Sequence, residues 1–348
     1  MDSPELSLMT NPGPPPNTLA VVRLLTALVA IGLGPLLAVA VTGCASTKRV
    51  SIGDPTTSLE RAQAEIGQGK HQLALEELES LLKRPDAGPV RERARFWRTV
   101  CLRKLGYHEK SYESLKRFLE DYPISALAPK AEKELFELGV ELLQGAGGGF
   151  LGIPHALGMS LSGAVVLRYL KDVSPNGRWA ADAQRIIAQF YFDEGDFAMA
   201  ITEYRALIDD HPGSIWQPLA EYRLPLCRLK NSRGAAYDRK LLEDALAGFQ
   251  QYERRHPGGD YVKLARVHAK EVHNMLAEKN YRIADFYLDS KRIAAAVFYY
   301  KSTVQDYPET VWAQESLSRL QLVVKDYPDT EAARSAAETL DLSNRGRG

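Results

Sequence analysis

Small and large apolar residues recur at fixed positions ahead of a series of prolines. Twelve positions before each of four aromatic-Pro or His-Pro pairs stands a small residue, and a large apolar residue follows it four positions later. These offsets place both residues on one face of a helix. The pattern predicts a recurring helix with one buried face that ends before the proline. The small residues are Ser111, Ala200, Ala245 and Ala296, the large ones are Leu115, Tyr204, Phe249 and Tyr300, those directly after the small ones are Tyr112, Ile201, Leu246 and Val297, and the prolines are Pro123, Pro212, Pro257 and Pro308.

The most complete copy of this unit runs from Tyr281 to Pro308. Its first predicted helix ends at Asp289, and its second runs from Ala295 to Val304. Small residues where two helices approach, with large aromatic residues on the next turns of the same face, indicate a packed helical hairpin. The residues expected to pack within the first helix are Tyr281, Ile283, Ala284, Phe286, Tyr287 and Leu288.

Weaker copies extend the pattern along the chain. A degenerate copy runs from Leu59 to Pro85, and the stretch from Ser316 to Pro328 keeps the same register within a single helix. Units that each bury one face against their neighbours are typical of tetratricopeptide (TPR) arrays. We therefore predict an all-α, TPR-like α-solenoid of about five helical hairpin repeats plus a C-terminal helix.

The N-terminus carries a candidate export signal. An almost uninterrupted apolar run from Leu24 to Ala40 follows Arg23 and leads to Cys44. This segment resembles the lipobox of bacterial lipoproteins, which implies cleavage before Cys44 and acylation of that residue as a membrane anchor. The run is also near the length of a membrane-spanning helix, so an uncleaved span is the alternative. By resemblance to lipoprotein sorting, Ala45-Ser46 favours the outer membrane because it lacks the aspartate associated with inner-membrane retention.

Composition and charge limit the classes of function that this protein can have. Of the 348 residues, 45% are hydrophobic and 25% are charged, as in a globular protein, and the 44 basic and 44 acidic residues cancel. Without a net positive field, a nucleic-acid-binding protein is disfavoured. Cys101 and Cys227 lie far apart in apolar helical contexts, so we expect buried free thiols rather than a disulfide.

Two segments depart from the repeat pattern. Glycines crowd the stretch from Gln144 to Gly163, which predicts a break in the helix at its start, with helical periodicity resuming near Val165. It lacks the lysine of a phosphate-binding P-loop. We expect a loop between two repeat blocks whose apolar part packs on the array, or alternatively an apolar flap that contacts membrane or a client. A second, charged loop from Lys230 to Arg239 is predicted to protrude and make specific contacts.

The charged residues and the residue types that could act in catalysis give little support for an enzymatic reaction. The helix from Arg91 to Leu105 has arginines on one side, which could meet an acidic partner or lipid head groups, although a solvated face is the simpler interpretation. His211 and His256 precede repeat prolines and are interpreted as packing residues. No nucleophile, metal or glycine motif has the required sequence context. We therefore predict no enzymatic activity, no cofactor and no metal.

The candidate lipobox followed by degenerate TPR units resembles the BamD type of outer-membrane assembly lipoprotein, also called ComL or YfiO. The similarity is good from about Leu219 to Thr330, loose from Leu59 to Tyr122, and absent from about Gln144 to Pro175. Asn280 stands where that family usually carries a glutamate. The local matches are Tyr237-Asp238-Arg239, Ala245, Phe249, Pro257, Tyr261, Ala284, Phe286-Tyr287, Ala295-Ala296, Tyr299 and Tyr307-Pro308.

The resemblance implies a periplasmic scaffold on the inner face of the outer membrane. It would bind the periplasmic domains of the β-barrel insertase, unfolded outer membrane protein clients, or both. The alternatives are a TPR lipoprotein serving cell-wall enzymes or polysaccharide export, and a lipid-anchored enzyme. The candidate partner-binding residues are Tyr237, Asp238, Arg239, Arg282 and Tyr299, and the lipidation site is Cys44.

These inferences divide the chain into six predicted segments. They are a lipoprotein signal peptide (1–43), a lipidated tether (44–58), N-terminal TPR-like repeats (59–143), a Gly-rich insert with a connecting helix (144–177), C-terminal TPR-like repeats (178–341) and a disordered tail (342–348).

Overall fold

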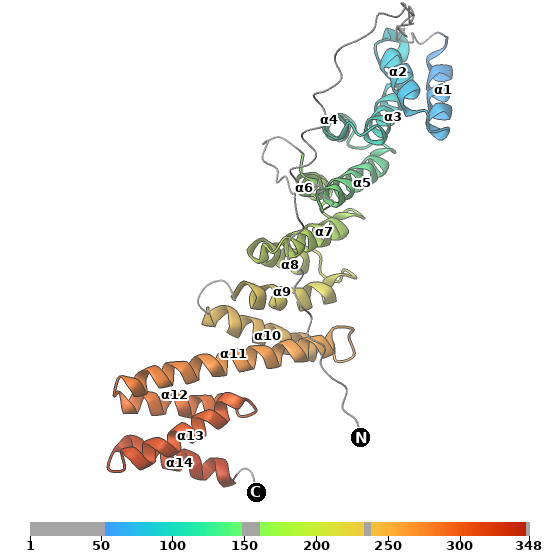
Figure 1. Cartoon of the computed structure of the whole chain (residues 1–348). Coiled ribbons are helices and arrows are strands. Elements are labelled where there is room, and N and C mark those ends of the chain that lie inside the picture. The colour runs from blue at the N-terminus through green and yellow to red at the C-terminus, as the bar shows by residue number, and fades with distance from the viewer. Residues whose placement is uncertain (1–52, 148–160, 233–237, 346–348) are drawn as a thin grey trace, which may run out of the picture. The chain divides into compact units, whose positions relative to one another are not determined.

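The computed structural model in Figure 1 describes residues 53–147, 161–232 and 238–345, and these residues form helices and no strands. The chain divides into two units, residues 1–47 and 48–348, and the second contains every described helix. The all-α prediction is confirmed. The helices are α1 (Pro55–Gly67), α2 (His71–Leu82), η1 (Pro85–Val90), α3 (Arg91–Lys104), α4 (His108–Asp121), α5 (Ala128–Gly147), α6 (Gly163–Val173), α7 (Ala180–Asp193), α8 (Phe197–Asp210), α9 (Gln217–Ser232), α10 (Arg239–Arg255), α11 (Val262–Asp289), α12 (Ile293–Asp306), α13 (Val311–Asp326) and α14 (Glu331–Arg345).

Each α-helix packs against the next along the chain, and several also contact the next but one (Figure 1). The fourteen α-helices of the described residues thus pair off from α1–α2 to α13–α14, which makes seven hairpins. The fold class is the predicted TPR-like array, but the described residues form two more hairpins than the predicted number of about five. The α5–α6 pair lacks the proline spacing, and α14 follows the single helix predicted from Ser316 to Pro328.

The predicted buried face is confirmed in every copy. All four small residues of the pattern are fully buried, and the four large residues that follow them are at most 1% exposed. Burying a side chain of this size contributes roughly 1.5–3 kcal/mol. Of the residues directly after the small ones, Tyr112 and Val297 are buried, whereas Ile201 and Leu246 are half-buried.

Proline ends these helices, and a hydroxyl begins the next ones. Five helices end one residue before an aromatic or histidine residue that precedes a proline, because the helical region is disfavoured for a residue before proline. In four copies, a serine or threonine two residues after the proline then accepts a backbone hydrogen bond. In two of them the donor lies in the first turn of the next helix, and in the other two it is the residue just before that helix. These capping residues are Ser125, Ser214, Thr310 and Thr330.

The turn inside a hairpin needs a left-handed residue, and one copy supplies lysine instead of glycine. Gly69, Gly106 and Gly195 have φ between 74° and 78°, and Lys291 takes the equivalent place between α11 and α12 with φ 60°. A side chain in this region costs about 1 kcal/mol. We expect Lys291→Gly to raise the free energy of unfolding by about that amount and Gly195→Ala to lower it similarly. Urea denaturation followed by circular dichroism measures both changes. A loss of stability in Lys291→Gly would contradict the inference that the positive φ of Lys291 is strained.

Four predicted boundaries differ from the structure. The charged loop predicted from Lys230 to Arg239 is shorter, because α9 continues to Ser232 and α10 begins at Arg239. Helix α1 begins at Pro55 rather than near Leu59, because Asp54 accepts hydrogen bonds from the first-turn N–H groups and proline suits the first helical position. Helix α5 continues through Gln144 to Gly147, so no break occurs where the glycines start. Helix α14 continues to Arg345, beyond the expected start of a tail at residue 342.

Two glycines allow α5 and α6 to approach closely. A Cβ atom on Gly163 would lie 2.3 Å from the Gly139 carbonyl oxygen, and one on Gly139 would lie 2.6 Å from the Leu167 side chain. Leu161 and the buried face of α6 join the same apolar cluster as α4, α5 and α7. The expected packing of the Gly-rich segment therefore holds for residues 161–163, while the proposed flap lies in residues 148–160, outside the described ranges.

Cys101 and Cys227 are buried free thiols, as predicted. Burial raises the pKa of both thiols to about 12, so neither is a reactive thiolate at neutral pH. Within the ranges that the structure describes, no helix is both long and apolar enough to span a bilayer. The candidate signal from Leu24 to Ala40, with Cys44, lies outside those ranges.

Candidate functional site

Helix α11 has 28 residues, twice the length of its partner α12, and it serves two hairpins. Val272 and Leu276 in its first part share an apolar cluster with α10, whereas Tyr281 and Ala284 in its last part share one with α12. Around the junction, a side of α11 remains open: Phe286 is exposed, and Met275 and Tyr287 pack only against the edges of the two clusters.

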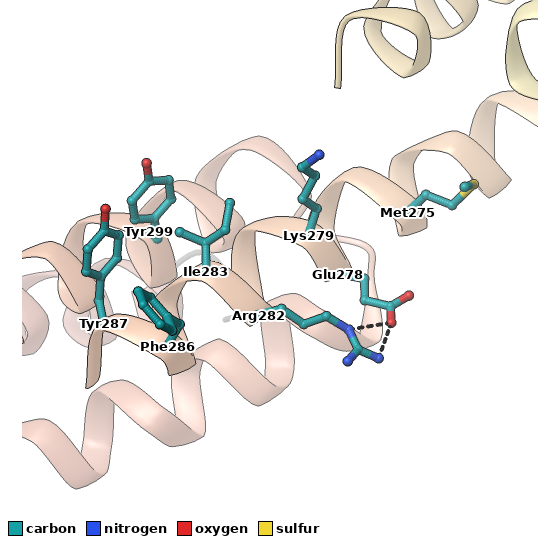
Figure 2. A pocket seen from close by; sticks show the side chains of 8 residues that line it. All are labelled: Met275, Glu278, Lys279, Arg282, Ile283, Phe286, Tyr287 and Tyr299. Carbon is teal, nitrogen blue, oxygen red and sulfur yellow. Dashed lines mark hydrogen bonds and ion pairs between the residues drawn. The ribbon is translucent and has the colours of Figure 1, made fainter. Parts of the chain in front are cut away.

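A groove of about 490 Å³ lies along this open side of α11 (Figure 2). Residues of α11 at helical spacing form its floor, and one tyrosine of α12 closes its end. We call it the α11 groove. Its lining residues are Met275, Glu278, Lys279, Arg282, Ile283, Phe286, Tyr287 and Tyr299.

The α11 groove has an aromatic end and a charged end (Figure 2). The rings of Tyr287 and Tyr299 stack with centroids 5.7 Å apart, and Phe286 meets Tyr287 edge-on while remaining 65% exposed. At the other end, Arg282 donates two hydrogen bonds of 2.6–2.8 Å to one carboxylate oxygen of Glu278. An exposed aromatic ring beside a stacked pair, bordered by charges, can receive an apolar side chain of another protein.

The structure brings together two of the predicted partner-binding residues and places two others elsewhere. Arg282 and Tyr299 both line the α11 groove. Asp238 instead caps α10 by accepting hydrogen bonds from the Lys240 and Leu241 N–H groups. Tyr237 and Cys44 lie outside the described residues.

Arg239 holds α10 against α11. Its Nη1 donates a 2.7 Å hydrogen bond to the side-chain oxygen of Asn280, which is only 1% exposed, and its Nε pairs with Glu243 at 2.9 Å. The amide of Asn280 thus accepts from arginine inside the protein, at the position where the resembled family usually carries a glutamate. Contact of Asp238 and Arg239 with a partner remains a prediction.

Sequence reasoning missed most of the α11 groove. Phe286 was expected to pack inside the hairpin, but nothing in the described residues covers two-thirds of its surface. The available signal was an apolar and charged stripe from Met275 to Tyr287 on one face of a long helix, opposite the buried stripe. Missing from the sequence was the fact that α10 and α12 leave this face open.

The two pre-proline histidines differ in their contacts. His211 packs as predicted, and its pKa is lowered by burial and by the charge of Lys171. The ring of His256 packs at a tilt against Tyr252 with centroids 4.8 Å apart, and its Nε2 also lies 2.7 Å from a carboxylate oxygen of Glu221. Within the described residues, no group of His, Cys, Asp and Glu is arranged to hold a metal ion.

Glu221 gives the link between α9 and α10 a pH dependence. Burial opposes its ionisation, but hydrogen bonds from Gln217 and His256 and the charge of Arg255 outweigh it, so the pKa of Glu221 is lowered from 4.5. The ionised carboxylate therefore stabilises the fold above pH 4.5, and this contribution is lost as the pH falls through the lowered folded value.

We expect Glu221→Gln to lower the free energy of unfolding by about 1 kcal/mol near neutral pH, because charged hydrogen bonds are lost. The stability difference between the variant and the native protein should shrink below pH 4.5, which is the ordinary pKa of a glutamate. Below that pH, Glu221 becomes protonated in the unfolded native chain, so its ionised form stabilises the fold less. Urea denaturation across this pH range measures it. Glu253→Gln is the control, because its exposed pair with Arg266 contributes less. A pH-independent difference would contradict the assigned role.

The fold and the groove define a class: an all-α protein of stacked TPR-like hairpins with an open groove on one long helix. Within that class, residues 162–322 match the model of the YfiO family, which is described as an outer membrane lipoprotein. The match contains the whole α11 groove. The match also includes residues 162–175, for which the sequence predicts no similarity to the family, and it leaves out residues 59–122, for which it predicts a loose one.

One relative and two solved structures are similar to this chain. The outer membrane protein assembly factor BamD of Caulobacter vibrioides is 24% identical over 155 residues, which are 44% of this chain and 51% of that protein. The match thus spans about half the length of the relative. Part of a TPR protein from Cytophaga hutchinsonii is 14% identical, with 76% of this chain and 88% of that chain covered and a TM-score of 0.36. A TPR protein from Parabacteroides merdae is 12% identical, with 83% and 98% covered and a TM-score of 0.33.

Proposed function

We propose that this protein is a lipid-anchored scaffold of outer membrane protein assembly. Acylated at Cys44, it would lie on the periplasmic face of the outer membrane and bind the periplasmic domains of a β-barrel insertase, unfolded barrel clients, or both. The observation that carries the proposal is the family match over residues 162–322, together with the similarity to BamD of Caulobacter vibrioides.

The α11 groove supplies a physical means of binding. Its aromatic end is preformed by the stacked tyrosines, so a partner's apolar side chain can enter without ordering these rings first. Arg282 and Glu278 at the other end hold a charge pair that a partner's polar groups can join. The scaffold therefore works by binding alone, and no catalytic residue or cofactor is assigned.

A second scaffold function remains distinct from this one. A TPR lipoprotein that organises cell-wall enzymes or polysaccharide export would use the same hairpins and the same anchor. The groove's chemistry does not separate the two, because aromatic anchors suit many protein partners. The partner recovered from cells decides between them.

The test is membrane fractionation combined with site-specific crosslinking. A photo-reactive phenylalanine analogue replaces Phe286 in the α11 groove, and in a matched protein it replaces Phe298, which is equally exposed on α12 but lies outside that groove. Both are compared with Cys44→Ala. We expect outer membrane fractionation, release or non-processing of Cys44→Ala, and an insertase or barrel adduct from position 286 well above that from 298.

Each alternative outcome is specific. Outer membrane location with wall enzymes as adducts would replace assembly by the second scaffold function. Equal adducts from positions 286 and 298 would remove the α11 groove from the interface. Unchanged membrane association in Cys44→Ala would rule out the acyl anchor.

A further inference from the structure

A second, smaller pocket lies between the N-terminal helices and has a different chemistry from the α11 groove. It measures about 260 Å³ and opens between the end of α2 and the facing sides of α3 and α4. We call it the arginine pocket. Its lining residues are Leu82, Arg95, Arg98, Ser114, Arg117 and Phe118.

Three of these six residues are arginines and none is acidic. Arg98 is held in place by a 2.9 Å hydrogen bond to the Ser114 hydroxyl and a 3.4 Å ion pair with Glu79. Arg95 is held by Asp121 and lies over the Tyr122 ring at 5.6 Å. Both carboxylates approach from outside the lining, so the pocket itself presents guanidinium groups. By contrast, the α11 groove has Glu278 beside Arg282.

Arg117 supplies the charge that is not compensated. It is exposed, and within the described residues it has no carboxylate partner, unlike Arg95 and Arg98. The floor beneath the arginines is apolar, formed by Leu82 and the buried Phe118. Guanidinium groups over an apolar floor attract an anion more strongly than the same groups in water, and their planar donors match phosphate oxygens in pairs.

We propose that the arginine pocket binds a phosphate group, and that in the cell this phosphate is the head group of an anionic phospholipid. Residues 45–54 join the predicted lipidated cysteine to α1, and such a link spans at most about 40 Å when fully extended. The hairpins that carry the pocket are therefore held close to the membrane surface. The choice of lipid over soluble phosphate rests on the proposed anchoring, whereas the phosphate chemistry rests on the pocket alone.

The test uses the chain from Lys48, because residues 48–348 form a unit of their own and lack the anchor that would bind any vesicle. Cosedimentation compares vesicles of pure phosphatidylcholine with vesicles that also contain phosphatidylglycerol. Inorganic phosphate is added as a competitor against chloride at matched ionic strength. Thermal unfolding with and without inorganic phosphate reports binding without vesicles, and circular dichroism confirms that each variant is folded.

Arg117→Gln and Arg93→Gln remove the same charge from exposed sites, inside the pocket and outside it. We expect binding to the phosphatidylglycerol vesicles, competition by phosphate, and about fivefold weaker binding for Arg117→Gln. Arg93→Gln should change binding much less. Phosphate should raise the Tm of the native chain and not that of Arg117→Gln.

Other outcomes overturn specific steps. Equal losses in the two variants would show diffuse attraction to the surface and exclude the pocket. Stabilisation by phosphate without vesicle binding would keep the phosphate chemistry and exclude lipid as its source. No response to phosphate or vesicles would overturn the whole inference. None of these results depends on a barrel protein, so they fail or succeed separately from the scaffold function.

Discussion

Gly163→Ala should lower the free energy of unfolding by about 3 kcal/mol, at the upper end of what overpacking costs. The new Cβ would meet the Gly139 carbonyl oxygen at 2.3 Å and the Leu143 backbone nitrogen at 2.9 Å. Both atoms belong to the backbone of α5, so a side-chain rotation cannot relieve the clash. The two helices must separate, which would open the apolar cluster formed by α5, α6 and their neighbours.

The matched control is Gly145→Ala on α5, the helix that Gly163 of α6 contacts. A Cβ there has no heavy atom within 4 Å, and alanine is the better helix former, so we expect no loss and a gain of up to about 0.5–1 kcal/mol. Urea denaturation followed by circular dichroism measures the difference. Hydrogen exchange of the α5 and α6 amides shows whether the loss is local, as expected for a repeat array. Similar stabilities for the two variants would mean that the helices do not cross at contact distance.

Phe286→Ala should weaken partner binding by about 2 kcal/mol, or roughly 30-fold, if the α11 groove is the contact surface. The ring is 65% exposed, so its removal should leave the fold and the stacked Tyr287–Tyr299 pair largely unchanged. The measurement is titration of the purified protein with the proposed partner, the periplasmic domains of a β-barrel insertase. Urea denaturation of the variant checks that stability is retained.

Phe298→Ala is the control for this experiment. Phe298 is 66% exposed, comes from the adjacent helix α12 and lines a different groove, which it shares with α14. The same atoms are removed at the same exposure, so a general loss of surface hydrophobicity would affect both variants alike. Affinity that falls equally in both, or in neither, would contradict the assignment of the α11 groove.

The spacing of residues predicted the helices well, because the effects that start, orient and stop a helix act between residues close together in the sequence. The small residue at position 296 and the tyrosine four positions later had to share a helix face, and Tyr307-Pro308 had to end that helix. Both are found, and the same holds for the other copies. The missed α5–α6 hairpin shows the limit: it is held by the contact of Gly139 with Gly163, which no proline spacing marks.

The candidate site was predicted only in part, for a physical reason. Arg282 and Tyr299 were named from family resemblance and meet in the α11 groove, but Phe286 was assigned to the interior. The position of Phe286 on the helix would be the same whether its side chain were buried or exposed. Whether such a residue is covered depends on where the neighbouring helices end, and that is settled by packing between elements.

The sequence by itself determined an all-α chain of repeated hairpins, the buried face of each repeat and the residues that stop it, because these follow from helix geometry and proline sterics. The tertiary structure alone decided which outward faces stay open. It placed Arg239 against the buried Asn280, left Phe286 exposed on α11, and brought Arg95, Arg98 and Arg117 around one pocket. Such groupings join residues from different helices, so they exist only once those helices have packed.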